Sequence, residues 1–154
     1  IDIHTRSVLV LKDLPLLQEY SDQVRIQVSL ATMNTAFAKL VEPRVPGPKA
    51  RLKILEVARG AGIPIGVTLA PIFPSIPHRP NAHEDIHALV DAISKFTPDH
   101  IYAESLHARG VTLKLLKEDL GYDLVDLKHW NDLAKTTVQV ALNQNGLEGT
   151  WWDG

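Results

Sequence analysis

The chain has 154 residues and a formal net charge of −2, from 16 basic and 18 acidic side chains, and 45% of its residues are hydrophobic. One domain with a substantial core fits this length, and the near-neutral charge gives no global attraction to nucleic acid or anionic membranes. The chain contains no cysteine. Disulfides, thiolate zinc sites, a cysteine nucleophile and an iron–sulfur cluster held by these residues alone are therefore excluded.

The first third of the chain alternates between short apolar strands and helices. We predict a strand, a helix, a strand of period two and a short helix, over residues 1–4, 14–20, 24–30 and 35–41. Asp13 is the candidate N-cap of the first helix, because its carboxylate can accept from backbone amides there. The second helix ends before Pro43, which cannot continue it.

The same alternation continues to the end of the chain. A helix begins at Pro48, where apolar residues recur every three or four positions. The nearly continuous apolar run over 63–70 predicts a strand that is covered on both faces. The remaining predicted elements are a helix, a strand, two helices and a closing strand, over residues 82–95, 100–104, 112–119, 127–143 and 149–152.

This order of elements predicts an α/β fold with a parallel sheet and right-handed connections. A complete barrel of eight repeats needs about 250 residues, whereas this chain holds four or five repeats. The fold is therefore a doubly wound sheet or part of a barrel. In both architectures ligands bind where the parallel strands end.

Polar side chains gather at these predicted strand ends. They are Thr5, Arg6, Ser7, Ser29, Thr32, Thr68, Glu104, Ser105, His107 and Arg109. Hydroxyls, guanidinium groups and one carboxylate in one place predict a site for a polar ligand, but no set among them identifies a reaction. Glu104 and Arg109 serve equally well as site residues and as a local ion pair. Arg44, in a proline-rich loop, either binds an anion or is simply exposed.

A metal site is an alternative use of the histidines. His83 and His87 lie four residues apart on a predicted helix, with His78 and Asp85 nearby, which is a spacing that suits metals. We prefer the interpretation that these histidines are exposed and uncoordinated, with Glu84 and Asp85 favoured by the helix dipole.

The three tryptophans also have two interpretations. Trp130, Trp151 and Trp152 could form an aromatic platform for nucleobases, but we favour a role in closing a core edge or an interface. The sequence has no glycine-rich phosphate loop and no nucleophile elbow.

Four stretches, in matching order and spacing, resemble radical SAM proteins of the branch similar to spore photoproduct lyase. They are residues 3–17, 28–32, 40–46 with the following 51–52, and 61–67 with 70–74. The resemblance covers about residues 1–105 and implies a six-stranded partial (βα) barrel, of which this chain would be roughly the second half. It also implies a lyase-like parent enzyme that cleaves S-adenosylmethionine (SAM) to a 5′-deoxyadenosyl radical with a [4Fe-4S] cluster.

The resemblance assigns roles to individual residues. Arg6 would contact the SAM carboxylate and Ser29 the methionine portion, with Thr5 and Ser7 flanking that site. Thr68 to Ala70 would lie near the adenine. The residues assigned to the substrate side are Arg44, Glu104 and Arg109.

Two features of that family are absent from this chain. The motif of three cysteines, C-x-x-x-C-x-x-C, and the glycine-rich segment that holds the SAM amino group both precede the region of resemblance. We therefore expect residues 1–154 to be one α/β domain, an N-terminally truncated part of a longer cytoplasmic protein, and inactive without the cluster-binding part. We also expect a partner chain or swapped segment to cover the strand edge at residues 1–4.

The expected partners are SAM and, through the parent protein, nucleic acid, with no membrane partner. Two other functions stay open. One is a metal-dependent hydrolase or isomerase of barrel type, using His4, His78, His83, His87 or Glu104. The other is a non-catalytic α/β scaffold. The role of the segment after Gly110 is not predicted.

Overall fold

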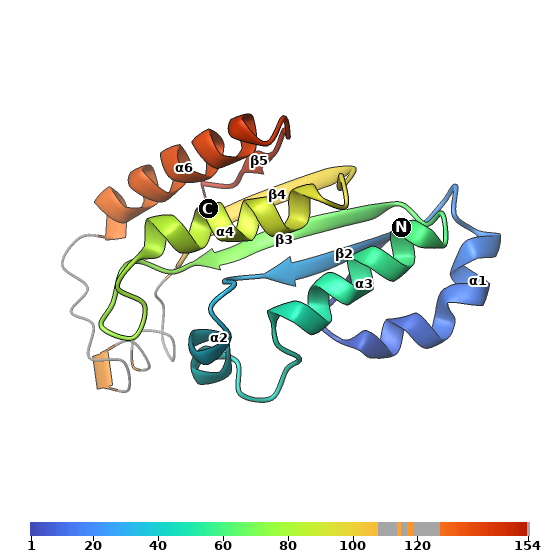
Figure 1. Ribbon diagram of the computed structural model, residues 1–154, viewed down its shortest axis with the longest axis horizontal. Helices are drawn as coiled ribbons and strands as arrows, with labels where there is room; N and C mark the ends of the chain where they lie inside the picture. Colours follow the sequence, from blue (N-terminus) through green and yellow to red (C-terminus); the bar gives the residue numbers. More distant parts are fainter. Residues whose placement is uncertain (108–113, 115–116, 119–126, 154) are drawn as a thin grey trace.

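The computed structural model describes residues 1–107, 114, 117–118 and 127–153. Its centre is a five-stranded sheet in which all neighbouring strands are parallel, in the order β1-β2-β3-β4-β5 (Figure 1). The strands are β1 (Asp2–Thr5), β2 (Arg25–Leu30), β3 (Ile65–Ile72), β4 (His100–Ser105) and β5 (Thr150–Trp151). Spatial order equals chain order, which is the order of strands in a barrel and not in a doubly wound sheet.

The helices alternate with these strands as expected. They are the 3₁₀ helix η1 (Val8–Asp13), α1 (Leu14–Glu19), α2 (Thr35–Val41), α3 (Pro48–Gly60), α4 (Ala82–Ser94) and α6 (Leu127–Gln144). The predicted helix over residues 112–119 falls largely outside the described residues.

Two local predictions need correction. Asp13 stands at the N-cap position of α1, but its side chain makes no capping hydrogen bond, because η1 leads directly into α1. Ser7 is the side chain that caps, and it accepts from the backbone N–H of Leu9 at 3.2 Å. Strand β3 begins at Ile65 rather than at residue 63. The N–H of Ile63 still donates to the carbonyl of Ala58 in the last turn of α3, after Gly62 with φ +74°.

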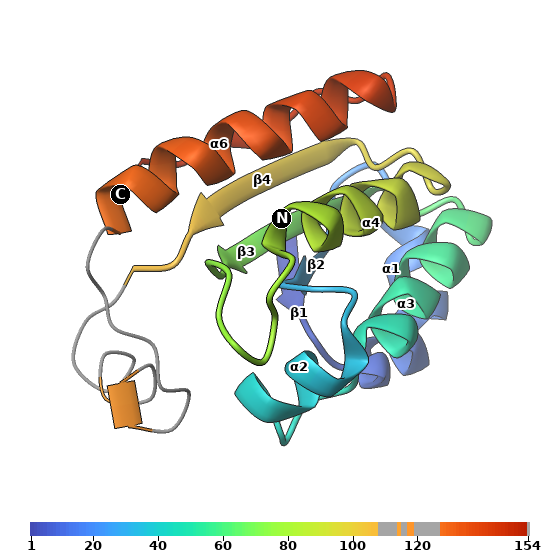
Figure 2. The ribbon, with the colours of Figure 1, turned by 60° about the vertical axis from the view of Figure 1, so that its left-hand side comes forward.

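Helices α3, α4 and α6 cover one face of the sheet, and the core lies between them and the strands (Figure 2). Alternate residues of each strand point into this layer, since side chains alternate between faces along a strand. The buried strand residues of this layer are Ile26, Val28, Leu30, Ile65, Val67, Leu69, Ile101 and Ala103. This covered face explains why the strands are so apolar in sequence.

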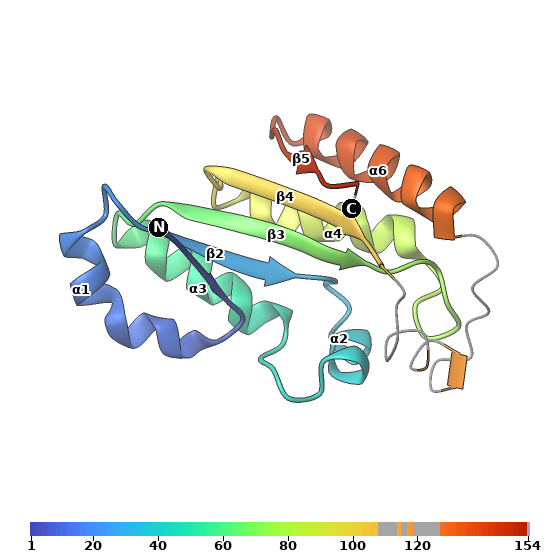
Figure 3. The same ribbon diagram turned by 180° about the vertical axis from the view of Figure 1, so that it is seen from behind.

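The other face of the sheet is open and polar, and Figure 3 views it with α3 and α4 behind the strands. Cross-strand register places His4, Gln27, Gly66 and His100 in one row, and Ser29, Thr68, Tyr102 and Thr150 in the next. Thr68 and Ala70 are only partly buried, so the prediction that this strand is covered on both faces is wrong for its second half.

Candidate functional site

In the described part of the chain, two cavities lie at and near the carboxyl ends of the strands, where the fold predicts ligand binding. The larger, of about 340 Å³, is lined by Arg6, Val41, Glu42, Pro71, Phe73, Glu104, Ser105, Leu106 and His107. The smaller, of about 210 Å³, is lined by His4, Thr68, Tyr102, Ala103, Glu104 and Trp152. Glu104 lines both cavities.

Arg6 is one of three charged side chains that are joined by hydrogen bonds beside the larger cavity. Its Nη1 donates to Glu42 Oε1 at 2.9 Å, and Arg51 Nη2 donates to Glu42 Oε2 at 2.6 Å. Arg51 is buried and also donates to the carbonyls of Pro46 and Ser29, at 2.7 and 3.0 Å. The Arg6 side chain is 53% exposed. Two guanidinium groups share one carboxylate, so the group has an excess positive charge at the cavity.

Arg51 was not predicted as a site residue, although the sequence holds a signal for it. It precedes Ile54, Leu55 and Ala58 by three, four and seven residues, which places it on the apolar face of α3. A guanidinium on a buried helix face needs partners, and here it finds two carbonyls and Glu42.

The other residues assigned to SAM differ in what they contact. Thr5 Oγ1 accepts from the backbone N–H of Ser7 at 3.0 Å, and Ser7 caps η1, so both hydroxyls stabilise the turn around Arg6. Ser29 and Thr68 are register neighbours on the open face, and Thr68 lines the smaller cavity. Ala70 is partly exposed near the end of β3.

The residues assigned to the substrate side also differ in their surroundings. Arg44 is exposed and forms no ion pair or side-chain hydrogen bond with any described residue. Glu104 Oε2 lies 3.8 Å from His107 Nε2, beyond hydrogen-bonding distance. Arg109 lies outside the described residues, and with it the predicted pair to Glu104.

Gln27 lies between His4 and Gly66 in the cross-strand register of the open face, and its own side chain is fully buried. Its Nε2 donates to Thr68 Oγ1 at 3.0 Å, while its Oε1 has no hydrogen-bond partner among the described residues. A Cβ placed on Gly66 would lie 1.8 Å from that Oε1. Glycine at position 66 leaves room for the Gln27 side chain in the conformation it has here, and a glycine inside an apolar strand was the sequence signal for such a close approach.

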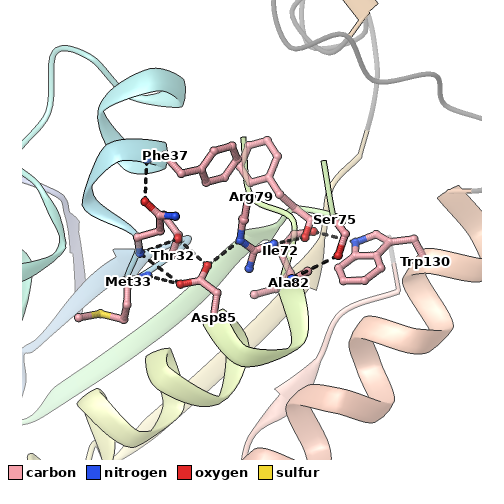
Figure 4. Close-up of polar contacts among 11 residues, drawn as sticks. Thr32, Met33, Phe37, Ile72, Ser75, Arg79, Ala82, Asp85 and Trp130 are labelled. Atoms are coloured by element: carbon pink, nitrogen blue, oxygen red, sulfur yellow. Dashed lines mark hydrogen bonds and ion pairs between the residues drawn. The ribbon is translucent and has the colours of Figure 1, made fainter. Parts of the chain in front are cut away.

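A buried ion pair joins the exits of β2 and β3 (Figure 4). Arg79 Nε donates to Asp85 Oδ2 at 2.6 Å, and Arg79 is 1% exposed. Asp85 also accepts from Thr32 Oγ1 at 2.5 Å and from the N–H of Met33 at 2.9 Å. Burial lowers the pKa of Arg79, and the charge of Asp85 opposes that shift. We call these four residues the strand-exit clamp.

The clamp fixes one wall of the larger cavity. A second nitrogen of Arg79, Nη1, donates to the carbonyl of Phe73, which lines that cavity. The Phe73 ring packs edge-on against Phe37, with centroids 5.1 Å apart. Trp130 Nε1 donates to the carbonyl of Ile72 at 3.0 Å (Figure 4). The backbone at the end of β3 is thus held from both sides.

The histidines do not assemble a metal site in the described part of the chain. No group of three or more His, Asp or Glu side chains that could hold a metal occurs there. His83 Nδ1 lies 3.1 Å from Thr137 Oγ1, and Asp85 belongs to the clamp. The metal-dependent alternative therefore has no ligand set among these residues.

The tryptophans divide between the two interpretations. Trp130 is in the core, at 6% exposure, as predicted. Trp152 is 58% exposed and lines the smaller cavity, where its ring contacts His107 edge-on at 5.6 Å between centroids.

No helix in the described ranges is both long and apolar enough to cross a membrane.

Comparison with curated proteins finds uncharacterised relatives. A protein of Acidianus two-tailed virus is 41% identical over 151 residues, which are 97% of this chain and 50% of that protein. A protein of Mycobacterium tuberculosis is 32% identical over 114 residues, 73% of this chain and 33% of that one. The chain thus spans about half the length of the first relative, and no protein-family model matches it.

Comparison with solved structures finds the same fold. A spore photoproduct lyase variant with bound AdoMet and dinucleoside spore photoproduct superposes with a TM-score of 0.70 at 12% identity, covering 97% of this chain and 49% of that one. Streptococcus suis SuiB bound to S-adenosylmethionine gives 0.65 at 18% identity, covering 98% and 32%. A domain of a pyruvate-formate lyase-activating enzyme from Bacteroides vulgatus gives 0.62 at 14% identity, covering 98% and 80%. The five parallel strands with their helices therefore match part of a radical SAM barrel core, as the resemblance implied.

Proposed function

We propose that this chain forms the SAM-binding second half of a radical SAM barrel, in a protein whose cluster ligands lie outside these 154 residues. The observation that carries the proposal is the larger cavity at the carboxyl ends of the strands, with Arg6 on its wall. Two of the superposing structures hold SAM, and the chain spans about half of its first relative. We further propose that it is one α/β domain of a longer, cytoplasmic, lyase-like enzyme.

The cavity suits a zwitterion of the size of SAM. Its volume of about 340 Å³ falls at the lower end of ligand sites, roughly 300–1,000 Å³. Arg6 supplies positive charge for the SAM carboxylate. A [4Fe-4S] cluster does not fit these residues, because they include no cysteine.

SAM bound beside a reduced cluster supplies radical chemistry that protein side chains lack. The residues of this chain bind and orient it. In our proposal Arg6 holds the carboxylate, and the turn made by Thr5 and Ser7 presents the Arg6 side chain. Ser29 and Thr68, adjacent in register, contact the methionine portion and the region of the adenine, with Ala70 beside them.

We assign the substrate to the side of Glu104, Arg44 and Arg109. A nucleic acid is the proposed partner of the whole protein, supported by the dinucleoside bound to the superposing lyase. Glu104 and Trp152 are the groups of the described chain best placed for such a ligand, since both line the smaller cavity.

The test uses the protein with the coding sequence that precedes residue 1, reconstituted anaerobically with iron and sulfide. We expect a cluster spectrum and reductive cleavage of SAM to 5′-deoxyadenosine. Arg6→Ala and Ser29→Ala are expected to slow this cleavage, with the larger loss for Arg6→Ala, at roughly tenfold or more for a charge-assisted contact. A protein that forms no cluster would favour a non-catalytic scaffold, and full cleavage by both variants would refute the assigned site.

A further inference from the structure

The buried guanidinium of Arg51 is fixed by three acceptors from three parts of the chain. Its Nε donates to the carbonyl of Pro46 at 2.7 Å, its Nη1 to the carbonyl of Ser29 at 3.0 Å, and its Nη2 to Glu42 Oε2 at 2.6 Å. Arg51 is 2% exposed, so water has little access to these bonds. A planar fork bonded through all three of its nitrogens has one orientation, which the point charge of a lysine ammonium would not reproduce.

Glu42 connects this fixed group to the larger cavity. Its Oε2 is held by Arg51, and its Oε1 accepts from Arg6 Nη1 at 2.9 Å. The Glu42 side chain is 15% exposed, and both Glu42 and Arg6 line the cavity. Because one carboxylate oxygen is bonded to a buried partner, the other oxygen is held in one place beside the Arg6 guanidinium.

Arg6 is the most exposed of the three side chains, at 53%. Its bond to Glu42 uses one of the five N–H groups of a guanidinium. A long side chain that is open to solvent loses rotamer freedom when it binds a ligand, and this loss lowers affinity. A guanidinium already held by a carboxylate has lost part of that freedom before the ligand arrives.

We propose that Glu42, held by Arg51, is a positioning residue for SAM, which orients Arg6 so that other N–H groups of this guanidinium meet the ligand carboxylate. This deepens the proposed function, on which it rests. Charge alone would act in the opposite direction, because the carboxylate of Glu42 repels a ligand anion and partly neutralises Arg6. Positioning and charge therefore predict opposite effects when Glu42 is replaced.

The experiment measures the affinity of the 154-residue chain for SAM and for decarboxylated SAM by calorimetric titration. The two ligands share the adenosine, the sulfonium and the ammonium and differ in the carboxylate, so the ratio of their dissociation constants reports the contact with Arg6. Wild type is expected to bind SAM on the order of tenfold or more tightly than the decarboxylated ligand. Arg6→Ala is expected to bring this ratio close to one.

Two substitutions of Glu42 separate position from charge. In Glu42→Gln the single carbonyl oxygen stays with Arg51, because a buried guanidinium left without an acceptor costs most, so the amide NH₂ faces the Arg6 donors. Glu42→Asp keeps the charge but is one methylene too short to reach both guanidinium groups. Both variants are expected to weaken SAM binding roughly three- to tenfold and to leave decarboxylated SAM within about twofold. Glu56→Gln, at an exposed carboxylate paired with Lys53, is the matched control and changes neither affinity.

Double variants test whether Glu42 acts through Arg6. In an Arg6→Ala background, Glu42→Gln is expected to change SAM affinity by less than about twofold, because the side chain that it orients is gone. Arg51→Lys frees Glu42 from the other side and is expected to lower the ratio in the same way, with circular dichroism reporting the fold. If Arg51→Lys does not fold, the two Glu42 variants decide.

The outcomes that overturn the proposal differ from those that overturn the proposed function. A ratio raised by Glu42→Gln, a wild-type ratio in Glu42→Asp, or equal weakening of both ligands by the two variants would show that Glu42 does not position Arg6. A loss with Arg6→Ala alone refutes this inference and leaves the SAM site. A wild-type ratio of one refutes the proposed function, and the role of Glu42 with it.

Discussion

The two faces of the sheet differ in almost every respect. The covered face is packed by α3, α4 and α6 with aliphatic side chains, and its strand residues are almost fully buried. The open face carries Arg25, Gln27, Thr68, Tyr102 and Glu104, and ends in the two cavities. Because strand residues alternate between faces, each strand contributes to stability with one set of side chains and to binding with the other.

The strand-exit clamp belongs to neither face and joins them. Asp85 comes from α4, a helix of the covered face, while its partners hold loops that lead to the larger cavity. Substitutions at the clamp and on the covered face should therefore lower the free energy of unfolding most. Substitutions on the open face should mainly change ligand affinity.

The largest effect is expected at the clamp. Asp85→Asn leaves the buried Arg79 without a carboxylate, and breaking one side of a buried pair destabilises a protein by about 3–5 kcal/mol. Urea unfolding measures the loss. Asp91→Asn, an exposed position on the same helix, is the control and should stay within about 0.5 kcal/mol.

A core truncation in β3 should come next. Leu69→Ala opens a cavity on the covered face and is expected to cost about 2–5 kcal/mol, whereas Thr68→Ala, the adjacent residue on the open face, should cost about 1 kcal/mol or less. Both values come from denaturant unfolding. Equal losses for the two would break the contrast between the faces.

A smaller loss is expected where the open face is tightly packed. Gly66→Ala puts a methyl group into the space of Gln27 Oε1 and should cost about 1–3 kcal/mol. Gln27→Ala in the same chain should recover much of that loss, because the two groups compete for one volume. A double variant no better than the sum of the two single changes would contradict this packing.

The smallest effect concerns acid stability at the amino end of the open face. A hydrogen bond from Arg25 lowers the pKa of Asp2 below its ordinary value of 3.8. A carboxyl group whose pKa is lower in the folded protein than in the unfolded chain stabilises the folded state at pH values above its unfolded pKa. This contribution disappears as the pH falls through the folded pKa. Asp2→Asn should therefore lower the free energy of unfolding slightly at pH values above about 4, and the difference from wild type should disappear as the pH falls below the folded pKa of Asp2; the effect stays small because Asp2 is exposed.

Much of the fold could be predicted from local sequence patterns. The period-two run of residues 24–30 and the helical spacing after Pro48 identify β2 and α3, because these signals depend on neighbours in the chain. The start of β3 was misplaced, because Gly62 and Ile63 continue the last turn of α3. The parallel sheet followed from the alternation of short strands and helices, whereas that alternation left the strand order open between a doubly wound sheet and a barrel.

The site was harder to predict, because it is formed by residues that are far apart in sequence and come into contact only in the folded chain. Arg6 and Glu104 were found as polar residues at strand ends. Asp85 was interpreted as a residue favoured by the dipole of its helix, because nothing local links it to Thr32, which lies 53 positions away in sequence. The role of Trp152 depends equally on β5 lying beside β4.

The most direct test of the account is calorimetric titration of SAM into three versions of the protein: wild type, Arg6→Ala and Arg25→Ala. Arg6 is at the cavity end of the sheet, and Arg25 is on the open face at its other end. We predict that Arg6→Ala weakens binding roughly tenfold or more, while Arg25→Ala leaves it within about twofold. Equal losses for both arginines, or no change with Arg6→Ala, would contradict a SAM site at the carboxyl ends of these strands.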